Sequence, residues 1–300
     1  MSNHAHSTIL ITGANGQVGF ELTRSLQGLG TLVALDRSRL DLADLDQVRA
    51  VVRQIKPTLI VNAAAYTAVD RAESESELAM LVNGQAPGVL AEEAKRLGAA
   101  MIHYSTDYVF DGTKSCPYVE EDMVNPQNAY GRSKLAGERA VAEVGGAHLT
   151  LRTSWVYGRR GGNFLLTMLR LAAERPELRI VADQYGAHTW CASIAALTAH
   201  VVAQARAVPV RDTADWWTDK SGTYHMTASG STSWFGFAEA IFELAALELK
   251  PKVVPIAASD YPLPAKRPAN SRLLNDKLAS AFGLKSPDWR DALHQALKHG

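Results

Sequence analysis

The sequence predicts an α/β fold built on a doubly wound parallel sheet. Short apolar runs of strand length alternate with amphipathic stretches of helix length up to Tyr104, which is the pattern of a parallel sheet covered by helices on both faces. A glycine-rich turn joins the first run to the first helical stretch. The 300 residues suffice for one large domain or two interleaved ones.

The first apolar run, Thr8–Thr12, leads into a turn with glycines at positions 13, 16 and 19, and a helical pattern starts at Val18. Glycines permit a tight turn and close approach of a pyrophosphate, and a helix N-terminus offers free N–H groups. A flanking strand and helix favour a dinucleotide loop over a purely structural turn. We expect this loop to bind through Gly13, Asn15, Gly16, Gln17, Val18 and Gly19.

The second run, Leu32–Asp36, ends on an acid about 20 residues after the loop, where a carboxylate accepts from an adenosine ribose 2′-hydroxyl. Arg37 can instead pair with a 2′-phosphate, so NADH and NADPH both remain open. Asp44 is the expected N-cap of a helix through Ile55.

A third run, Thr58–Asn62, is followed by small residues that let an adenine or ribose lie against the backbone, although tight packing alone would also explain them. These residues are Ala63, Ala64, Ala65, Tyr66 and Thr67. We expect a polar loop over Val69–Glu73 and a helix over Glu77–Leu97.

The stretch from Ser105 to Lys134 carries the candidate chemistry. Ser105, Thr106 and Asp107 follow a short apolar run, so they are expected at the carboxyl edge of the sheet. If the chain is helical at Tyr130, then Lys134 lies one turn further on the same face. A lysine ammonium favours the phenolate, so we expect the Tyr130 pKa to fall toward neutrality, which suits a general acid.

Composition argues against several classes of protein. Lys plus Arg and Asp plus Glu number 31 each, so no global field attracts nucleic acid or an anionic membrane. No apolar run approaches the ~20 residues of a spanning helix, and Met1–His6 lacks the features of a secretory signal. Cys116, read as a loop residue, and Cys191, read as a small apolar residue, form no disulfide framework, so we expect a cytoplasmic location.

The second half of the chain has weaker signals. We expect a strand at Leu149–Leu151, a helix from Asn163 to Glu174, a strand from Gly222, a helix from Trp234 to Glu248 capped by Thr232 or Ser233, and a last helix at Trp289–Lys298. The basic segment 158–162 either closes over a diphosphate or is a surface turn. Residues 208–221 form an expected insertion or long loop, in which Trp216 and Trp217 either mark an interface or pack.

The motifs at Gly13–Gly19, Asn62–Ala65, Ser105-Thr106 and Tyr130-x-x-x-Lys134 together resemble the extended short-chain dehydrogenase/reductase superfamily. Longer motifs resemble dTDP-4-dehydrorhamnose reductases over nearly the whole chain. They are Asn62-Ala-Ala-Ala-Tyr-Thr-Ala-Val-Asp70-Arg-Ala-Glu73, Ser105-Thr-Asp-Tyr-Val-Phe-Asp-Gly112, Tyr130-Gly-Arg-Ser-Lys-Leu-Ala-Gly-Glu138, Arg152-Thr-Ser-Trp-Val-Tyr157, Asp183-Gln-Tyr-Gly186 and Arg267-Pro-Ala-Asn-Ser271.

The resemblance implies a Rossmann-type NAD(P)-binding domain over about residues 1–160, to which segments near 187–215 return, and a smaller, interleaved C-terminal α/β substrate domain over 161–300. It implies reduction of the C4 ketone of dTDP-4-dehydro-β-L-rhamnose, the last step toward dTDP-L-rhamnose. Tyr130 would donate the proton, Lys134 would tune Tyr130 and bond the nicotinamide ribose, and Thr106 would hydrogen-bond the carbonyl.

The expected cofactor set adds Asp36, Arg37, Asp41, Leu42, Tyr130 and Lys134 to the loop and the Ala63–Thr67 segment. The expected substrate set is Val69, Asp70, Thr106, Asp107, Tyr108, Trp155, Asn163, Gln184 and Arg267. Arg267 is the candidate for the diphosphate.

This chain departs from the family pattern at two places. His188 stands where the family usually has proline; we expect a surface substitution, with a titrating group near the site as the alternative. Some members hold a divalent metal such as Mg²⁺ through glutamates at a dimer contact. Glu21 matches one ligand, but Ala192 and roughly His299 replace the others. We therefore expect no metal there and leave a homodimer open.

Two other functions compete with this interpretation. The first is another enzyme of the superfamily with the same fold, either a sugar-nucleotide 4,6-dehydratase or another reductase or epimerase. The dehydratase typically needs Asp-Glu after Ser-Thr, whereas Tyr108 follows Asp107 here. The second is a non-catalytic NADP-binding subunit like the regulatory subunit of methionine adenosyltransferase. Intact Thr106, Tyr130 and Lys134 favour catalysis.

Overall fold

The computed structural model describes residues 7–247 and 250–299, and a six-stranded parallel sheet dominates it. The strand order is β10-β5-β4-β3-β1-β2, so the direction of winding reverses between β1 and β3. The strands are β1 (Thr8–Thr12), β2 (Thr31–Leu35), β3 (Leu59–Asn62), β4 (Ala100–Thr106), β5 (His148–Thr153) and β10 (Gly222–His225). In such sheets ligands bind at the carboxyl edge beside this reversal.

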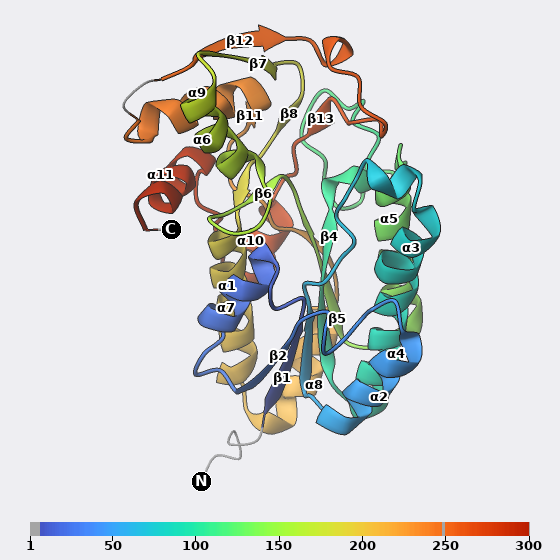
Figure 1. Ribbon diagram of the computed structural model, residues 1–300. Helices are drawn as coiled ribbons and strands as arrows, with labels where there is room; N and C mark the ends of the chain where they lie inside the picture. Colours follow the sequence, from blue (N-terminus) through green and yellow to red (C-terminus); the bar gives the residue numbers. More distant parts are fainter. Residues whose placement is uncertain (1–6, 248–249, 300) are drawn as a thin grey trace.

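Helices cover both faces of the sheet (Figure 1). One face carries α2 (Leu45–Ile55), α3 (Ser76–Met80), α4 (Ala86–Leu97) and α5 (Ala129–Val144), and the other carries α1 (Gln17–Ser25) and α7 (Cys191–Ala207). Because side chains alternate along a strand, Leu10 joins the core under α2 and α4, while Ile9 and Ile11 join the core under α1 and α7.

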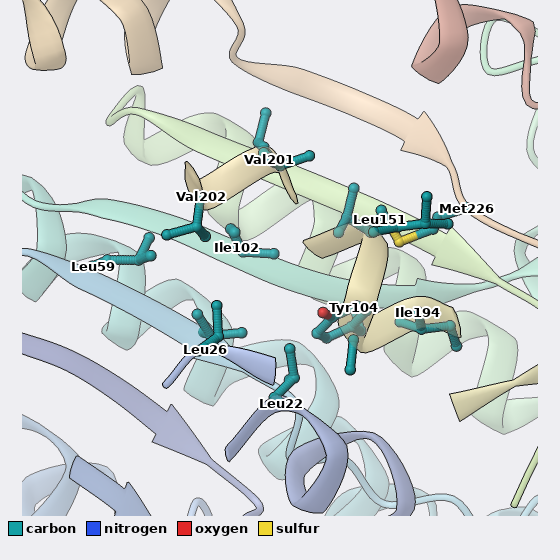
Figure 2. Close-up of a cluster of buried hydrophobic side chains, with 14 of the residues drawn as sticks. Leu22, Leu26, Leu59, Ile102, Tyr104, Leu151, Ile194, Val201, Val202 and Met226 are labelled. Carbon is teal, nitrogen blue, oxygen red and sulfur yellow. The ribbon is translucent and has the colours of Figure 1, made fainter. Parts of the chain in front are cut away.

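Figure 2 shows the second of these cores. Leu22 of α1 and Leu26 just after it belong to the same buried cluster as Ile102 of β4 and Ile194 of α7. All four side chains are at most 1% exposed. Burial of this kind contributes about 1.5–3 kcal/mol for each large aliphatic side chain, which fixes the position of α1 and therefore of the glycine loop before it.

Side-chain caps set where several helices begin. Asp44 accepts from the Gln47 N–H at the start of α2, as predicted, and Asn128 accepts from the Gly131 N–H at the start of α5. The predicted helix over Glu77–Leu97 contains a π-helical stretch at Leu81–Gln85. Asn83 in this stretch bonds both the N–H and the carbonyl of Tyr66, so the wider turn links the helix to the cofactor segment.

The C-terminal elements form a second, smaller layer at the carboxyl edge of the large sheet (Figure 1). Its strands are β6 (Val156–Tyr157), β7 (Glu177–Val181), β8 (Tyr185–Gly186), β9 (Thr189–Trp190), β11 (Thr232–Ser233), β12 (Lys252–Ile256) and β13 (Asn270–Ser271). Its helices are α6 (Phe164–Glu174), α9 (Trp234–Leu244) and α11 (Trp289–His299), which share one apolar core. Ser233 caps α9, which ends at Leu244, short of the predicted extent; the predicted last residue, Glu248, lies outside the described residues.

Later segments return to the large sheet. Residues 208–221, predicted to be an insertion or loop, contain a helix, α8 (Thr213–Asp219). Trp217 is 6% exposed in the large-sheet core and Trp216 packs against Phe282, so both tryptophans pack rather than form a surface. Strand β10 extends the sheet, and α10 (Asp276–Phe282) covers it.

Within the described residues, no single helix has the length and apolar composition to span a membrane. Only a pair, Cys191–Ala207 with Val210–Asp219, meets these two criteria together, and it is bent by 117°.

Candidate active site

One cavity of about 600 Å³ lies at the carboxyl edge of the large sheet. Every predicted cofactor residue lines it except Gly19. Gly19 instead lets the first turn of α1 pack closely against the glycine loop, because a Cβ there would lie 2.1 Å from the Gly13 carbonyl oxygen. Gly13 has a φ of +68°, and a Cβ on it would lie 2.8 Å from the Ala64 backbone.

The start of α1 is open toward this cavity. Gly16 is its N-cap and makes no side-chain capping bond, so the first N–H groups of the helix stay available to an anion. The segment 158–162, predicted either to close over a diphosphate or to be a turn, places Gly161 and Gly162 in the cavity wall. Arg160 of this segment packs 3.8 Å over the Phe20 ring.

A chain of buried hydrogen bonds supports the cavity floor. The Ala64 N–H donates to Thr12 Oγ1 at 3.2 Å, and Thr12 Oγ1 donates to Asn62 Oδ1 at 2.6 Å. Asn62 Nδ2 lies 3.1 Å from His103 Nδ1. Burial lowers the pKa of His103, so its ring is neutral and Nδ1 accepts. Three neighbouring strands therefore fix the segment after β3 against the glycine loop.

Asp36 ends β2 at the rim of the cavity. Its Oδ1 accepts from Ser38 N at 3.0 Å and Ser38 Oγ at 2.6 Å, and its Oδ2 accepts from Asn15 Nδ2 at 2.7 Å. The hydrogen bonds to Ser38 and Asn15 lower the pKa of Asp36. Arg37 pairs with Asp41 at 3.2 Å on the exposed side. The rim therefore presents an oriented carboxylate and an arginine that already has a partner.

Two of the predicted catalytic residues, Tyr130 and Lys134, line the cavity, and the third, Thr106, lies beside Tyr130. Thr106 is the last residue of β4, and Tyr130 and Lys134 lie in the first turns of α5. Lys134 is 2% exposed, and its Nζ donates to the Tyr104 carbonyl at 2.6 Å. Burial lowers the pKa of Lys134 to about 8, against an opposing effect of the Glu138 carboxylate.

The expected fall in the Tyr130 pKa is wrong for the protein without ligand. Burial raises the pKa of Tyr130 to about 12, and contact with the Thr106 hydroxyl only partly offsets the rise. The expectation failed because the lysine ammonium is bound to the Tyr104 carbonyl, and because loss of water around the phenol outweighs attraction by a charge one turn away.

Asp107 is an unusual group beside these residues. It is 2% exposed, and its Oδ1 accepts from Thr106 Oγ1 at 3.1 Å. Its Oδ2 has no hydrogen-bond partner among the described residues. Burial raises the pKa of Asp107 to about 7, so this carboxyl changes charge near neutrality.

Two hydroxyl groups of the cavity wall were absent from the predicted set. Ser105 Oγ and Thr153 Oγ1 are buried and lack hydrogen-bond partners within the described residues, and both residues line the cavity. They stand at the carboxyl ends of β4 and β5, where Thr106 pairs with Thr153. Ser105 was predicted at the carboxyl edge but not named as a site residue, and Thr153 follows the charged Arg152, so no apolar run marked it. Buried hydroxyls without hydrogen-bond partners in a cavity wall indicate a cavity for a polar ligand rather than for apolar groups.

None of the predicted substrate residues lines this cavity, but Tyr108 contacts Tyr130, which does line it. The Tyr108 ring lies 5.6 Å from that of Tyr130, edge to face. Arg267 Nη2 pairs with Asp70 Oδ2 at 2.8 Å, and its guanidinium lies 5.9 Å from the Tyr108 ring. Tyr108, Arg267 and Asp70 therefore lie together next to Tyr130, and Val69 directly precedes Asp70 in the chain.

The remaining predicted substrate residues, Trp155, Asn163 and Gln184, lie at three different places in the structure. Trp155 stacks on Trp234 at 4.0 Å, and its indole would meet a Cβ on Gly186 at 2.9 Å. Asn163 caps α6 and donates to Gln17 Oε1 at 3.0 Å, so it contacts the glycine loop rather than the Tyr130 side. Gln184 is half-buried just before β8.

The preferred interpretation of His188 as a surface residue is wrong. His188 is 0% exposed and lies among aromatic rings, stacked on Phe237 at 3.7 Å. The described residues hold no group of three or more His, Cys, Asp or Glu side chains placed to bind a metal ion. The His299 side chain, named for the metal position, lies outside the described residues.

Comparison with known proteins agrees with this geometry. A family model described as "RmlD substrate binding domain" matches residues 7–300. A dTDP-4-dehydrorhamnose reductase from Burkholderia thailandensis is 56% identical over 291 residues, 95% of this chain and 96% of the relative. One from Escherichia coli K12 is 44% identical over 297 residues, 96% of each. The crystal structure of a dTDP-4-dehydrorhamnose reductase from Bacillus anthracis in complex with NADP matches with a TM-score of 0.89 and 35% identity, covering 98% of this chain and 100% of that one.

Proposed function

This chain belongs to the dTDP-4-dehydrorhamnose reductase family, and we propose that it reduces the C4 ketone of dTDP-4-dehydro-β-L-rhamnose to dTDP-β-L-rhamnose with NADPH or NADH. The observation that carries the proposal is that Tyr130 and Lys134 line a cavity built around a glycine loop, with Thr106 beside Tyr130 at the end of β4.

The cavity residues fit a dinucleotide. The open start of α1 suits the pyrophosphate, Asp36 suits the adenosine ribose, and the unpaired hydroxyls of Ser105 and Thr153 stand near Tyr130 and Lys134 in the same wall. When bound, the reduced nicotinamide supplies the hydride that a ketone needs to become an alcohol.

The side chains of the chain supply the proton and the charge stabilisation. With a pKa of about 12, Tyr130 is protonated at neutral pH and holds the proton that the alkoxide oxygen requires. The Thr106 hydroxyl lies beside Tyr130 and donates to Asp107 Oδ1 in the protein without ligand; on substrate binding it would turn to donate to the oxygen where negative charge develops. Lys134, buried beneath Tyr130, stabilises the phenolate left after proton transfer and is placed for the nicotinamide ribose.

The sugar nucleotide is proposed to lie between the two layers, against the wall beyond Tyr130. Arg267 is the cation available for a diphosphate on this wall, and its pairing with Asp70 keeps it oriented. Trp155 provides an apolar face on the opposite strand end for the sugar ring.

The test follows NADPH or NADH absorbance with enzymatically generated dTDP-4-dehydrorhamnose. We expect oxidation by the wild type and a loss of about 10²-fold or more in Tyr130→Phe, with the Kd of the cofactor unchanged. Tyr224→Phe is the matched control, because it removes a phenol that bonds the Lys220 carbonyl. No oxidation by a folded wild type that binds cofactor would refute the reductase and favour a binding subunit.

A further inference from the structure

His188 occupies a position that the proposed chemistry does not use. It lies between β8 and β9, where the chain crosses from the C-terminal layer toward α7. The ring is stacked on Phe237 at 3.7 Å with an interplanar angle of 15°. It meets Trp155 and Trp234 edge to face, each at 4.6 Å. One imidazole therefore touches both members of the stacked tryptophan pair.

The imidazole makes no conventional hydrogen bond to any residue that the structure describes. Neither Nδ1 nor Nε2 has a partner among the described residues, although the residue is 0% exposed. Burial lowers the pKa of His188 well below its usual value, so the ring is neutral and carries one N–H. A buried polar group without a partner is costly, whereas an N–H that points at an indole face makes a weak hydrogen bond. The two tryptophans, edge to face with the imidazole, are the π systems within its reach.

Trp155 is held in a strained backbone conformation. Its φ is +46°, in the left-handed region that residues other than glycine rarely adopt. The segment around His188 supplies the restraints on both sides. Ser154 Oγ donates to the Ala187 carbonyl at 2.8 Å, and the Thr189 N–H donates to the Trp155 carbonyl at 3.3 Å. The backbone beside Trp155 and its ring are therefore both fixed by residues 187–189.

We propose that His188 is a positioning residue for substrate binding, whose neutral imidazole holds the Trp155–Trp234 pair as a preformed wall for the sugar nucleotide. This inference rests on the proposed function, because it assigns the exposed part of Trp155 to the substrate. The stacking of Trp155 on Trp234 at 4.0 Å and 19° gives a flat surface, and His188 with Phe237 closes it from behind. Preorganisation of this kind raises affinity because no ordering cost remains at binding.

Two substitutions separate ring packing from the N–H group. His188→Ala removes the ring, so the KM for the sugar nucleotide should rise about tenfold, while kcat changes less than about threefold. His188→Phe keeps an aromatic ring without an N–H, so its KM should lie between those of the wild type and His188→Ala. His200→Ala is the control, because that imidazole lies exposed on α7.

A spectroscopic measurement reports the pair directly. Two stacked indoles couple, so we expect a near-ultraviolet circular dichroism signal that Trp155→Phe abolishes and His188→Ala reduces. A circular dichroism signal in His188→Phe equal to that of the wild type would show that ring packing alone holds the tryptophan pair. That result would support the positioning role and overturn the role of the N–H group. An unchanged KM and an unchanged signal in both His188 variants would overturn the proposal.

The failure of this proposal is distinct from failure of the proposed function. If the wild type does not oxidise cofactor, the reductase assignment fails, and calorimetric titration with dTDP-rhamnose then decides about His188. A Kd for dTDP-rhamnose that is about tenfold higher in His188→Ala than in the wild type supports the positioning role. Equal Kd values in the two proteins, or no binding to the wild type, overturn it. The cofactor Kd should be the same in all variants.

Discussion

Replacement of Asp107 by asparagine should stabilise the protein, and by an amount that depends on pH. Asp107 is 2% exposed, and burial raises its pKa from 3.8 to about 7. The folded protein therefore binds this proton more tightly than the unfolded chain does. The stability that the group contributes is complete below pH 3.8 and is lost as pH rises through 7.

The shift from 3.8 to about 7 sets the magnitude. At about 1.4 kcal/mol for each pKa unit, ionisation of Asp107 costs the folded state about 4 kcal/mol at pH 8 relative to acid. The amide side chain of the Asp107→Asn variant carries no charge at any pH, and its oxygen can still accept from Thr106. The free energy of unfolding of the variant minus that of the wild type should therefore rise by about 4 kcal/mol between pH 4 and pH 8.

Urea unfolding followed by tryptophan fluorescence at several pH values measures this difference. Asp111→Asn is the control of opposite sign, because hydrogen bonds from Thr113 and Tyr118 lower the pKa of Asp111 to about 2. Its stabilising contribution is present above pH 3.8 and is lost only as pH falls through about 2, so the cost of Asp111→Asn should be constant above about pH 5. A stability difference for Asp107→Asn that stays flat from pH 4 to pH 8 would show that Asp107 does not gain its charge at a cost to the folded state.

Three further predictions concern the cofactor site and its support. Gly19→Ala should weaken cofactor binding at least about tenfold in fluorescence titration, because its Cβ would lie 2.1 Å from the Gly13 carbonyl oxygen; an unchanged Kd would contradict the packing argument. Glu138→Ala should lower the free energy of unfolding by about 3–5 kcal/mol, because it leaves the 6%-exposed Arg152 without its 2.7 Å partner; calorimetry at pH 7 measures this loss. Asp36→Ala should shift the ratio of kcat/KM for NADH to that for NADPH toward NADPH by about tenfold, since the oriented carboxylate favours a 2′-hydroxyl; a ratio that does not move would be inconsistent with this role.

Most of the large sheet and its nucleotide loop could be predicted because their signals are local. Thr8–Thr12 and the glycines after it lie in one stretch, and the structure has β1 at the predicted residues. Asp44 caps α2 as expected for an acid before an amphipathic stretch. Helix α8 was missed because it is seven residues long, which is too short a window for a 3.6-residue period to stand out.

The site was less predictable where distant segments meet. Arg267 and Asp70 are 197 positions apart, so no local pattern shows that the arginine already has a carboxylate partner. His188 was predicted to be exposed because histidine is a polar residue type. Its burial is decided instead by aromatic rings from α9 and from the residue before β6. Tertiary packing overrides the average behaviour of a residue type in such places.

The most direct test of the central claim locates the transferred hydrogen. Wild-type protein is incubated with dTDP-4-dehydrorhamnose and nicotinamide cofactor carrying deuterium at its reducing carbon, and the product is examined by NMR. We expect deuterium at C4 of dTDP-rhamnose, at a rate that falls about 10²-fold or more in Tyr130→Phe. Deuterium at another carbon, or cofactor bound without transfer, would contradict a C4 ketone reductase.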